Sequence, residues 1–134
     1  MALETSIRRM QIVLAEPHSL VRRGLRQILA ERFDPCVVHE ARDAKELLDE
    51  VSRLSPDLLV VDISLPGGTG MDILKELHDR IGVAVPLIVT SDDPGPEFSR
   101  NVLLAGAHAV VLKERADEEL LDAIDEVRKG CVHH

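Results

Sequence analysis

Five short apolar runs alternate with five helical patterns along this chain of 134 residues. The runs cover residues 11–15, 36–40, 58–62, 86–90 and 109–112, and they are continuous in apolar residues instead of alternating with polar ones. Continuous apolar strands are typical of a parallel sheet that is covered on both faces. The alternation therefore predicts an α/β fold, with helices on both faces of one parallel sheet.

Each run is followed by apolar residues at helical spacing. Asp43 is a typical N-cap for the second helix, and Gly82 is a typical end for the third. The apolar stripes of the five predicted helices are Val21, Leu25, Ile28 and Leu29; Ala44, Leu47, Leu48 and Val51; Ile73, Leu74, Leu77 and Ile81; Phe98 and Val102; and Leu120, Leu121, Ile124 and Val127. We expect one domain over residues 1–130, and we set residues 131–134 apart as a tail that resembles the start of a purification tag.

The composition excludes several classes of function. A formal net charge of −8 argues against nucleic-acid binding by the chain itself, because phosphate contacts need a basic surface. Two Phe, with no Tyr or Trp, leave few platforms on which a flavin or base could stack. No apolar run approaches the length of a membrane span, and the two cysteines lack a metal-binding spacing, so we expect a cytoplasmic protein without a membrane partner.

Polar residues follow four of the predicted strands. They are Glu16 after the first, Asp62 at the end of the third, Ser91 after the fourth and Lys113 after the fifth. The carboxyl ends of parallel strands form one edge of the sheet, where ligands of such folds bind. Carboxylates suit a hard cation such as Mg²⁺, and a lysine and a hydroxyl stabilise phosphoryl oxygens. The pattern indicates phosphoryl transfer to an aspartate nucleophile, Asp62.

Three segments carry a family resemblance. The segments LAEPHSLVRRGLRQIL (residues 14–29), LLVVDISLPGGTG (residues 58–70) and AGAHAVVLK (residues 105–113) resemble the receiver domains of bacterial response regulators. The first segment is similar to the subclass that precedes a helix-turn-helix output domain. The resemblance covers about residues 11–129 and implies a flavodoxin-like three-layer sandwich, with a five-stranded parallel sheet in the order 2-1-3-4-5 and five helices.

The resemblance also implies roles for individual residues. Asp62 is implied to accept a phosphoryl group from a sensor histidine kinase. Glu16, Asp62 and the backbone carbonyl of Ser64 are implied as ligands of Mg²⁺. Lys113 is implied to pair with the phosphoryl oxygens, and Ser91 to be the switch hydroxyl, with Thr90 as the weaker candidate. The domain then takes part in phosphoryl transfer to its own aspartate and is not an enzyme in the usual sense.

The same resemblance implies partners beyond the kinase. The domain is expected to switch an output domain, transcriptional in kind, that follows Gly130 in a longer chain. Contact with DNA would come only through that missing domain. A homodimer is a further expectation from the family.

The sequence departs from the family pattern at three positions. Pro17 stands where the family has a second acid that binds the metal directly, so we expect weak Mg²⁺ binding, with Asp92 or Asp93 as minor candidates for a replacement acid. Val110 stands at the aromatic switch position, and Glu114 follows the lysine where proline is common.

These departures leave one alternative open: an atypical receiver that serves as a phosphorylation-independent protein-interaction module. A flavodoxin-like electron carrier is disfavoured, because the first loop is acidic and no aromatic residue follows a strand end. We interpret His18 as a solvated or capping residue. The arginines at positions 22, 23 and 26 are interpreted as a solvated helix face, although in the family this helix often meets the kinase.

Overall fold

The computed structural model describes residues 9–93 and 95–130. Its strands are β1 (Met10–Ala15), β2 (Cys36–Ala41), β3 (Leu58–Asp62), β4 (Leu87–Ser91) and β5 (Ala109–Leu112). Its helices are α1 (Ser19–Arg32), α2 (Ala44–Arg53), α3 (Gly70–Ile81), α4 (Pro96–Leu104) and α5 (Ala116–Arg128), with a short 3₁₀ helix, η2 (Lys113–Arg115). The five predicted helices are confirmed, and η2 is an addition to them.

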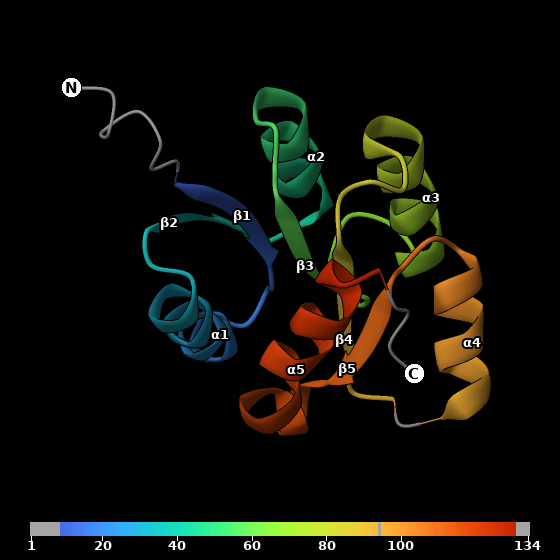
Figure 1. Cartoon of the computed structure of the whole chain (residues 1–134). Coiled ribbons are helices and arrows are strands. Elements are labelled where there is room, and N and C mark those ends of the chain that lie inside the picture. Colours follow the sequence, from blue (N-terminus) through green and yellow to red (C-terminus); the bar gives the residue numbers. More distant parts are fainter. Residues whose placement is uncertain (1–8, 94, 131–134) are drawn as a thin grey trace.

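All five strands are parallel and lie in the order β2-β1-β3-β4-β5. Figure 1 shows the sheet running through the molecule with helices on both sides. Alternate strand residues enter two separate cores: Val13 and Val61 pack with α2, α3 and α4, whereas Ile12 and Val60 pack with α1 and α5. The predicted three-layer fold and its strand order are therefore confirmed.

Local signals in the sequence set several helix ends. The Asp43 carboxylate accepts a hydrogen bond of 2.8 Å from the N–H of Glu46, which satisfies one free donor at the start of α2. Thr69 caps α3 in the same way through the N–H of Asp72. The third helix ends at Gly82, whose φ of 70° is the left-handed conformation that glycine adopts at little cost.

The predicted strand ends need one correction that affects the site. The fourth strand begins at Leu87 and ends at Ser91, so Ser91 is the last residue of the strand and does not follow it. The N–H of Leu87 bonds the ring of His108 instead of a strand partner, and Pro86 has no N–H to donate, which places the start of β4 one residue later than predicted. The other predicted strands agree with the structure to within one residue at each end.

Candidate functional site

Three charged side chains from distant parts of the chain meet at the carboxyl ends of the strands. Lys113 Nζ lies 3.1 Å from Asp62 Oδ2 and 3.1 Å from Glu16 Oε1. Glu16 is fully buried, Asp62 is 2% exposed, and the side chain of Lys113 is 8% exposed. The parallel topology brings these residues together, because β1, β3 and β5 all end at this edge of the sheet.

In this cluster, two acidic groups face one basic group. Two buried carboxylates share the Lys113 ammonium, whose hydrogen bonds go to Asp62 Oδ2 at 3.1 Å and Glu16 Oε2 at 3.3 Å. Burial alone lowers the pKa of Lys113, but the hydrogen bonds and charges of Asp62 and Glu16 outweigh burial and raise it. The lysine is therefore charged at neutral pH, and it lies between two acidic side chains.

The loop after β3 holds the Asp62 carboxylate in place. Its Oδ1 accepts a hydrogen bond of 3.1 Å from the N–H of Ser64, a local turn that aspartate commonly forms. The loop then returns tightly to α3 at Gly70, where a Cβ would lie 2.3 Å from the carbonyl oxygen of Ile63. Only glycine allows this approach, so the Pro-Gly-Gly-Thr-Gly segment positions Ser64 as well as starting the helix.

Thr90 and Ser91, the two candidate hydroxyls, are both buried at the end of β4. Thr90 pairs with Asp62 across β3 and β4, and its hydroxyl has no hydrogen-bond partner among the described residues. Ser91 pairs with Leu112, directly before Lys113, and its hydroxyl accepts a bond from the N–H of Asp93. The proton of the Ser91 hydroxyl is not used in this bond, and the Thr90 hydroxyl has no bond within the described part of the chain. Each can therefore donate to a phosphoryl oxygen, and both stay candidates for the switch hydroxyl.

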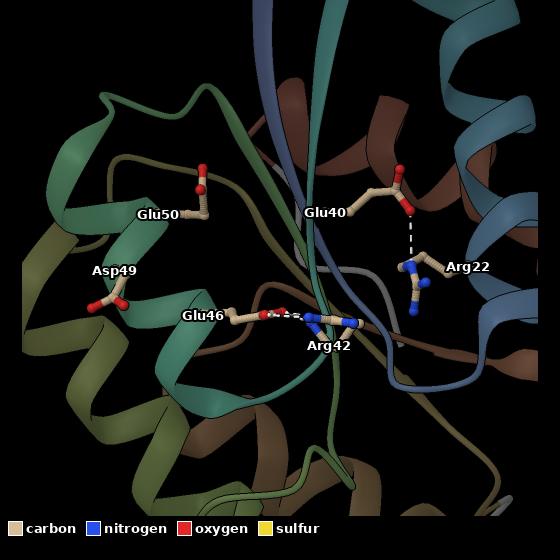
Figure 2. A pocket seen from close by; sticks show the side chains of 6 residues that line it. All are labelled: Arg22, Glu40, Arg42, Glu46, Asp49 and Glu50. Carbon is tan, nitrogen blue, oxygen red and sulfur yellow. Dashed lines mark hydrogen bonds and ion pairs between the residues drawn. The ribbon is translucent and has the colours of Figure 1, made fainter.

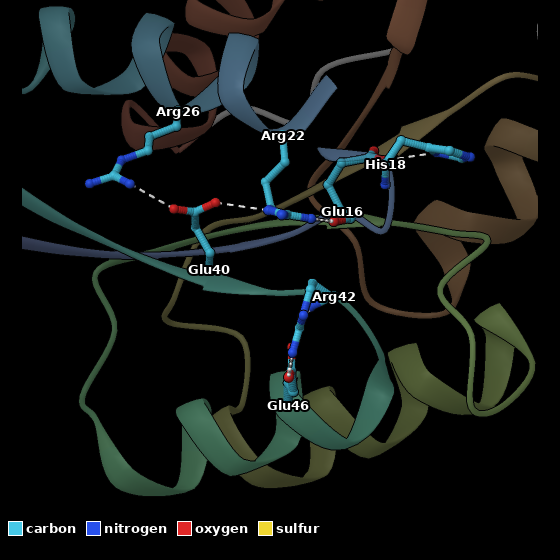
Figure 3. A network of polar contacts seen from close by, with 7 residues as sticks. All are labelled: Glu16, His18, Arg22, Arg26, Glu40, Arg42 and Glu46. Carbon is cyan, nitrogen blue, oxygen red and sulfur yellow. Dashed lines mark hydrogen bonds and ion pairs between the residues drawn. The ribbon is translucent and has the colours of Figure 1, made fainter. Parts of the chain in front are cut away.

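The corner from Glu16 to His18 is fixed on several sides, as Figure 3 shows. Glu16 Oε2 accepts a bond of 2.9 Å from the N–H of His18 and lies 3.0 Å from Nδ1 of the same residue. The Glu16 carbonyl accepts a hydrogen bond of 2.9 Å from Arg22 Nη1. The Glu16 N–H donates a hydrogen bond of 2.9 Å to the carbonyl of Ala41. The interpretation of His18 as a solvated residue is confirmed, because 69% of its side chain is exposed. It is also the N-cap residue of α1 by position, although its side chain makes no capping bond and instead contacts Glu16 at the rim of the site.

The predicted solvated face of α1 needs a correction at Arg22. Arg22 and Arg26 both bind the Glu40 carboxylate, at 2.8 Å through Arg22 Nε and at 2.7 Å through Arg26 Nη1. Only 14% of the Arg22 side chain is exposed, so this residue is tied to the edge strand β2 and is not solvated as predicted. Arg23 and Arg26 are exposed, which confirms the predicted solvated face for these two residues. The partner of Arg22 and Arg26 is Glu40 in the neighbouring strand β2. The spacing of residues in the sequence does not show that this acid lies next to α1.

A hollow of about 420 Å³ lies beside this network, between α1, β2 and α2. Figure 2 shows that its walls carry paired charges, with Arg22 bound to Glu40 and Arg42 bound to Glu46. The hydrogen bonds from Arg42 lower the pKa of Glu46 to about 2. The other two acids of its lining are paired with cations outside it, Asp49 with Lys45 and Glu50 with Arg53. Each acid that lines the hollow thus already has a cationic partner.

The donors at the strand ends suit a divalent cation. Ligand atoms of Glu16, His18 and Asp62 all lie within 4.8 Å of one another. Pro17 offers neither a carboxylate nor an N–H, and neither Asp92 nor Asp93 belongs to this group among the described residues. The two oxygens of Glu16 face different partners: Oε1 lies 3.1 Å from the Lys113 ammonium, whereas Oε2 faces the N–H and the ring of His18.

Comparison with known proteins identifies the family. A model of the response regulator receiver domain matches residues 12–125. The chain belongs to this family. The oxygen regulatory protein NreC of Staphylococcus aureus is 38% identical over 122 residues, which are 90% of this chain and 56% of the relative. The chain thus spans just over half the length of such relatives.

Two solved receiver structures are similar to this one. The isolated receiver domain of RcsB from Salmonella enterica serovar Typhimurium, determined with the phosphomimetic BeF₃⁻, has a TM-score of 0.83 and 26% identity, covering 95% of this chain and 94% of the other. A LuxR-family two-component response regulator from an Aurantimonas species has a TM-score of 0.82 and 30% identity, covering 95% and 90%. The predicted family membership is confirmed. None of the described helices is both long and apolar enough to cross a membrane.

Proposed function

We propose that the chain receives a phosphoryl group on Asp62 from the phosphohistidine of a sensor kinase. A carboxylate oxygen of Asp62 forms a bond to phosphorus, the P–N bond to the kinase imidazole breaks, and the released nitrogen takes up a proton from water. The observation that carries the proposal is the Lys113 ammonium 3.1 Å from Asp62 Oδ2, held in place by a second buried carboxylate. The acidic pair and the lysine are the groups that phosphoryl transfer needs.

Each residue at the site has a distinct proposed task. The Lys113 ammonium, which is paired with Asp62 before transfer, turns to the phosphoryl oxygens during it. It stabilises their charge, which increases as transfer proceeds. Ser91 donates its hydroxyl proton to the same oxygens once the group is attached, with Thr90 as the alternative. A divalent cation bound by Glu16, Asp62 and the Ser64 carbonyl supplies further positive charge to those oxygens. The absence of a second acid at Pro17 predicts that Mg²⁺ binds weakly here.

The proposed consequence is a switch for an output domain. Phosphorylation replaces the single charge of the Asp62 carboxylate with about two charges on the acyl phosphate, a net gain of about one negative charge, and the loops after β3 and β4 rearrange around Lys113 in response. The LuxR-family and RcsB relatives, together with the greater length of NreC, support a transcriptional output domain as the partner in a longer chain. A homodimer and contact with DNA through that domain belong to the same proposal.

The test is incubation with a small acyl phosphate and a divalent cation, followed by intact-mass measurement. Wild type should gain one phosphoryl group, and Asp62→Asn should gain none. Asp72→Asn, at an exposed position in the first turn of α3, is the matched control and should be labelled like wild type. A wild-type chain that stays unmodified under conditions that label an ordinary receiver would refute the proposal and favour the phosphorylation-independent interaction module.

The same assay separates the two candidate hydroxyls. Ser91→Ala should slow labelling or weaken the response to it, whereas Thr90→Val should leave both near wild type. The reverse result would assign the switch to Thr90.

A further inference from the structure

The side chain of His18 has no task in the phosphoryl transfer described above, yet its ring lies against the site. Nδ1 is 3.0 Å from Glu16 Oε2, and one atom of Asp62 lies within 4.8 Å of both residues' ligand atoms. Two ligands at about 2.1 Å from a metal and at right angles to each other are about 3 Å apart. The separation of Nδ1 and Oε2 therefore matches two adjacent positions around a bound cation.

The His18 side chain is 69% exposed, and its ring meets the site through the Nδ1 contact, while the backbone around it is fixed. Pro17 fixes the chain direction through its ring, and the N–H of His18 is bonded to Glu16 Oε2 at 2.9 Å. Arg22 holds the carbonyl of Glu16 from the other side at 2.9 Å, as seen in Figure 3. The Glu-Pro-His corner thus presents a carboxylate and an imidazole as a preformed pair, in a place where a carboxylate at position 17 is missing.

A buried hydroxyl beside Asp62 gives a second, independent sign of a ligand. Thr90 is 1% exposed, and its hydroxyl has no partner among the described residues. Because Thr90 and Asp62 are paired across two parallel strands, their side chains project from the same face of the sheet. A buried hydroxyl without a partner is costly, and a hydrated cation at the Asp62 carboxylate would supply a water to bond it.

The kind of cation follows from the donors. Mg²⁺ selects oxygen ligands and binds imidazole poorly, whereas Mn²⁺ through Zn²⁺ accept a nitrogen beside carboxylates. We propose that His18, Glu16 and Asp62 form a mixed nitrogen–oxygen site that binds a divalent cation able to accept an imidazole ligand, such as Mn²⁺, in preference to Mg²⁺. Glu16 then bridges, with Oε2 toward the cation and Oε1 toward Lys113. The inference deepens the proposed function, since it names the cation class of the same site.

The test compares affinities for two ions in the full chain. Free Mn²⁺ is followed by electron paramagnetic resonance during titration with MnCl₂, and MgCl₂ affinity is obtained by competition. Removing even an outer-shell partner of a metal ligand typically lowers affinity about 10–100-fold, so His18→Ala should weaken Mn²⁺ binding by at least about tenfold. Binding of Mg²⁺ should change less than about twofold, because Mg²⁺ does not use the ring.

His78→Ala is the matched control, since His78 is an exposed histidine near the end of α3, and it should keep the wild-type ratio of the two affinities. Adding ZnCl₂ to ¹⁵N-labelled protein gives a second readout, in which the Nδ1 resonance of His18 should shift on binding. An unchanged Mn²⁺ to Mg²⁺ ratio in His18→Ala, or a His18 resonance that does not move, overturns the inference and leaves the 3.0 Å contact as a plain hydrogen bond.

Failure of this inference and failure of the proposed function give different results. If Asp62 is labelled by the acyl phosphate, but His18→Ala leaves the ratio of affinities unchanged, only the cation assignment is wrong. If Mn²⁺ binds through His18 and Asp62 is never labelled, the metal site stands and the phosphoryl-transfer proposal falls.

Discussion

Replacing Lys113 with Met removes the ammonium that two buried carboxylates share, while keeping most of the side chain's apolar volume. In the folded protein, Asp62 and Glu16 are then left facing each other, both almost inaccessible to water. The unfolded chain has no such conflict, because water solvates each carboxylate separately. The substitution should therefore lower the free energy of unfolding at neutral pH.

The structure sets the size of this loss. At an effective dielectric constant of 20, charges 3.1 Å apart attract by about 5 kcal/mol, so the ammonium interacts strongly with each carboxylate before its own desolvation is subtracted. Removal of one partner from a buried ion pair typically costs about 3–5 kcal/mol. The carboxylate oxygens lie within 4.8 Å of each other, where their repulsion is at least about 3 kcal/mol at the same dielectric.

Urea unfolding followed by far-ultraviolet circular dichroism measures this loss, since the chain has no Trp or Tyr for fluorescence. A loss of 3–5 kcal/mol should lower the midpoint by about 2 M urea. The double variant Glu16→Gln/Lys113→Met should regain part of the stability, because only one carboxylate is left uncompensated. The reasoning is refuted if Lys113→Met unfolds at the wild-type urea concentration, or if the double variant is no more stable than the single one.

Three further predictions concern the metal site, a helix cap and an ion pair. Pro17→Asp should raise Mg²⁺ affinity at least about tenfold in a competition titration, because it supplies the missing carboxylate. Asp43→Ala should lower the unfolding free energy by about 1 kcal/mol in urea, because the N–H of Glu46 loses its cap. The Glu46 pKa is lowered from 4.5 to about 2, so the carboxylate stabilises the fold above pH 4.5 and this contribution is lost as the pH falls through about 2. Thermal midpoints of wild type and Glu46→Gln should therefore differ above pH 4.5 and converge near pH 2.

The fold was predictable because its signals are local and repeated. Continuous runs such as that ending at Asp62, a cap such as Asp43 and a stop such as Gly82 each act on a few neighbouring residues, and together they define the β–α units. The start of β4 was predicted one residue too early, because the residue that bonds Leu87 is His108, which is 21 positions away along the chain.

The candidate site was only partly predictable. The meeting of Glu16, Asp62 and Lys113 follows from strand order, since a residue just after a parallel strand must lie at one edge of the sheet. The contact of His18 with Glu16, and the binding of Arg22 to Glu40 and to the Glu16 carbonyl, depend on side-chain directions at a turn and on the edge strand. No spacing in the sequence specifies those directions.

The most direct test of the central claim is to locate the modification after phosphorylation with a small acyl phosphate. An aspartyl phosphate is reduced by borohydride to homoserine, and peptide mapping then reads which residue changed. The account predicts homoserine at position 62 and at no other carboxylate. Reduction at a different aspartate, or none in a chain that carries the added phosphoryl mass, would contradict it.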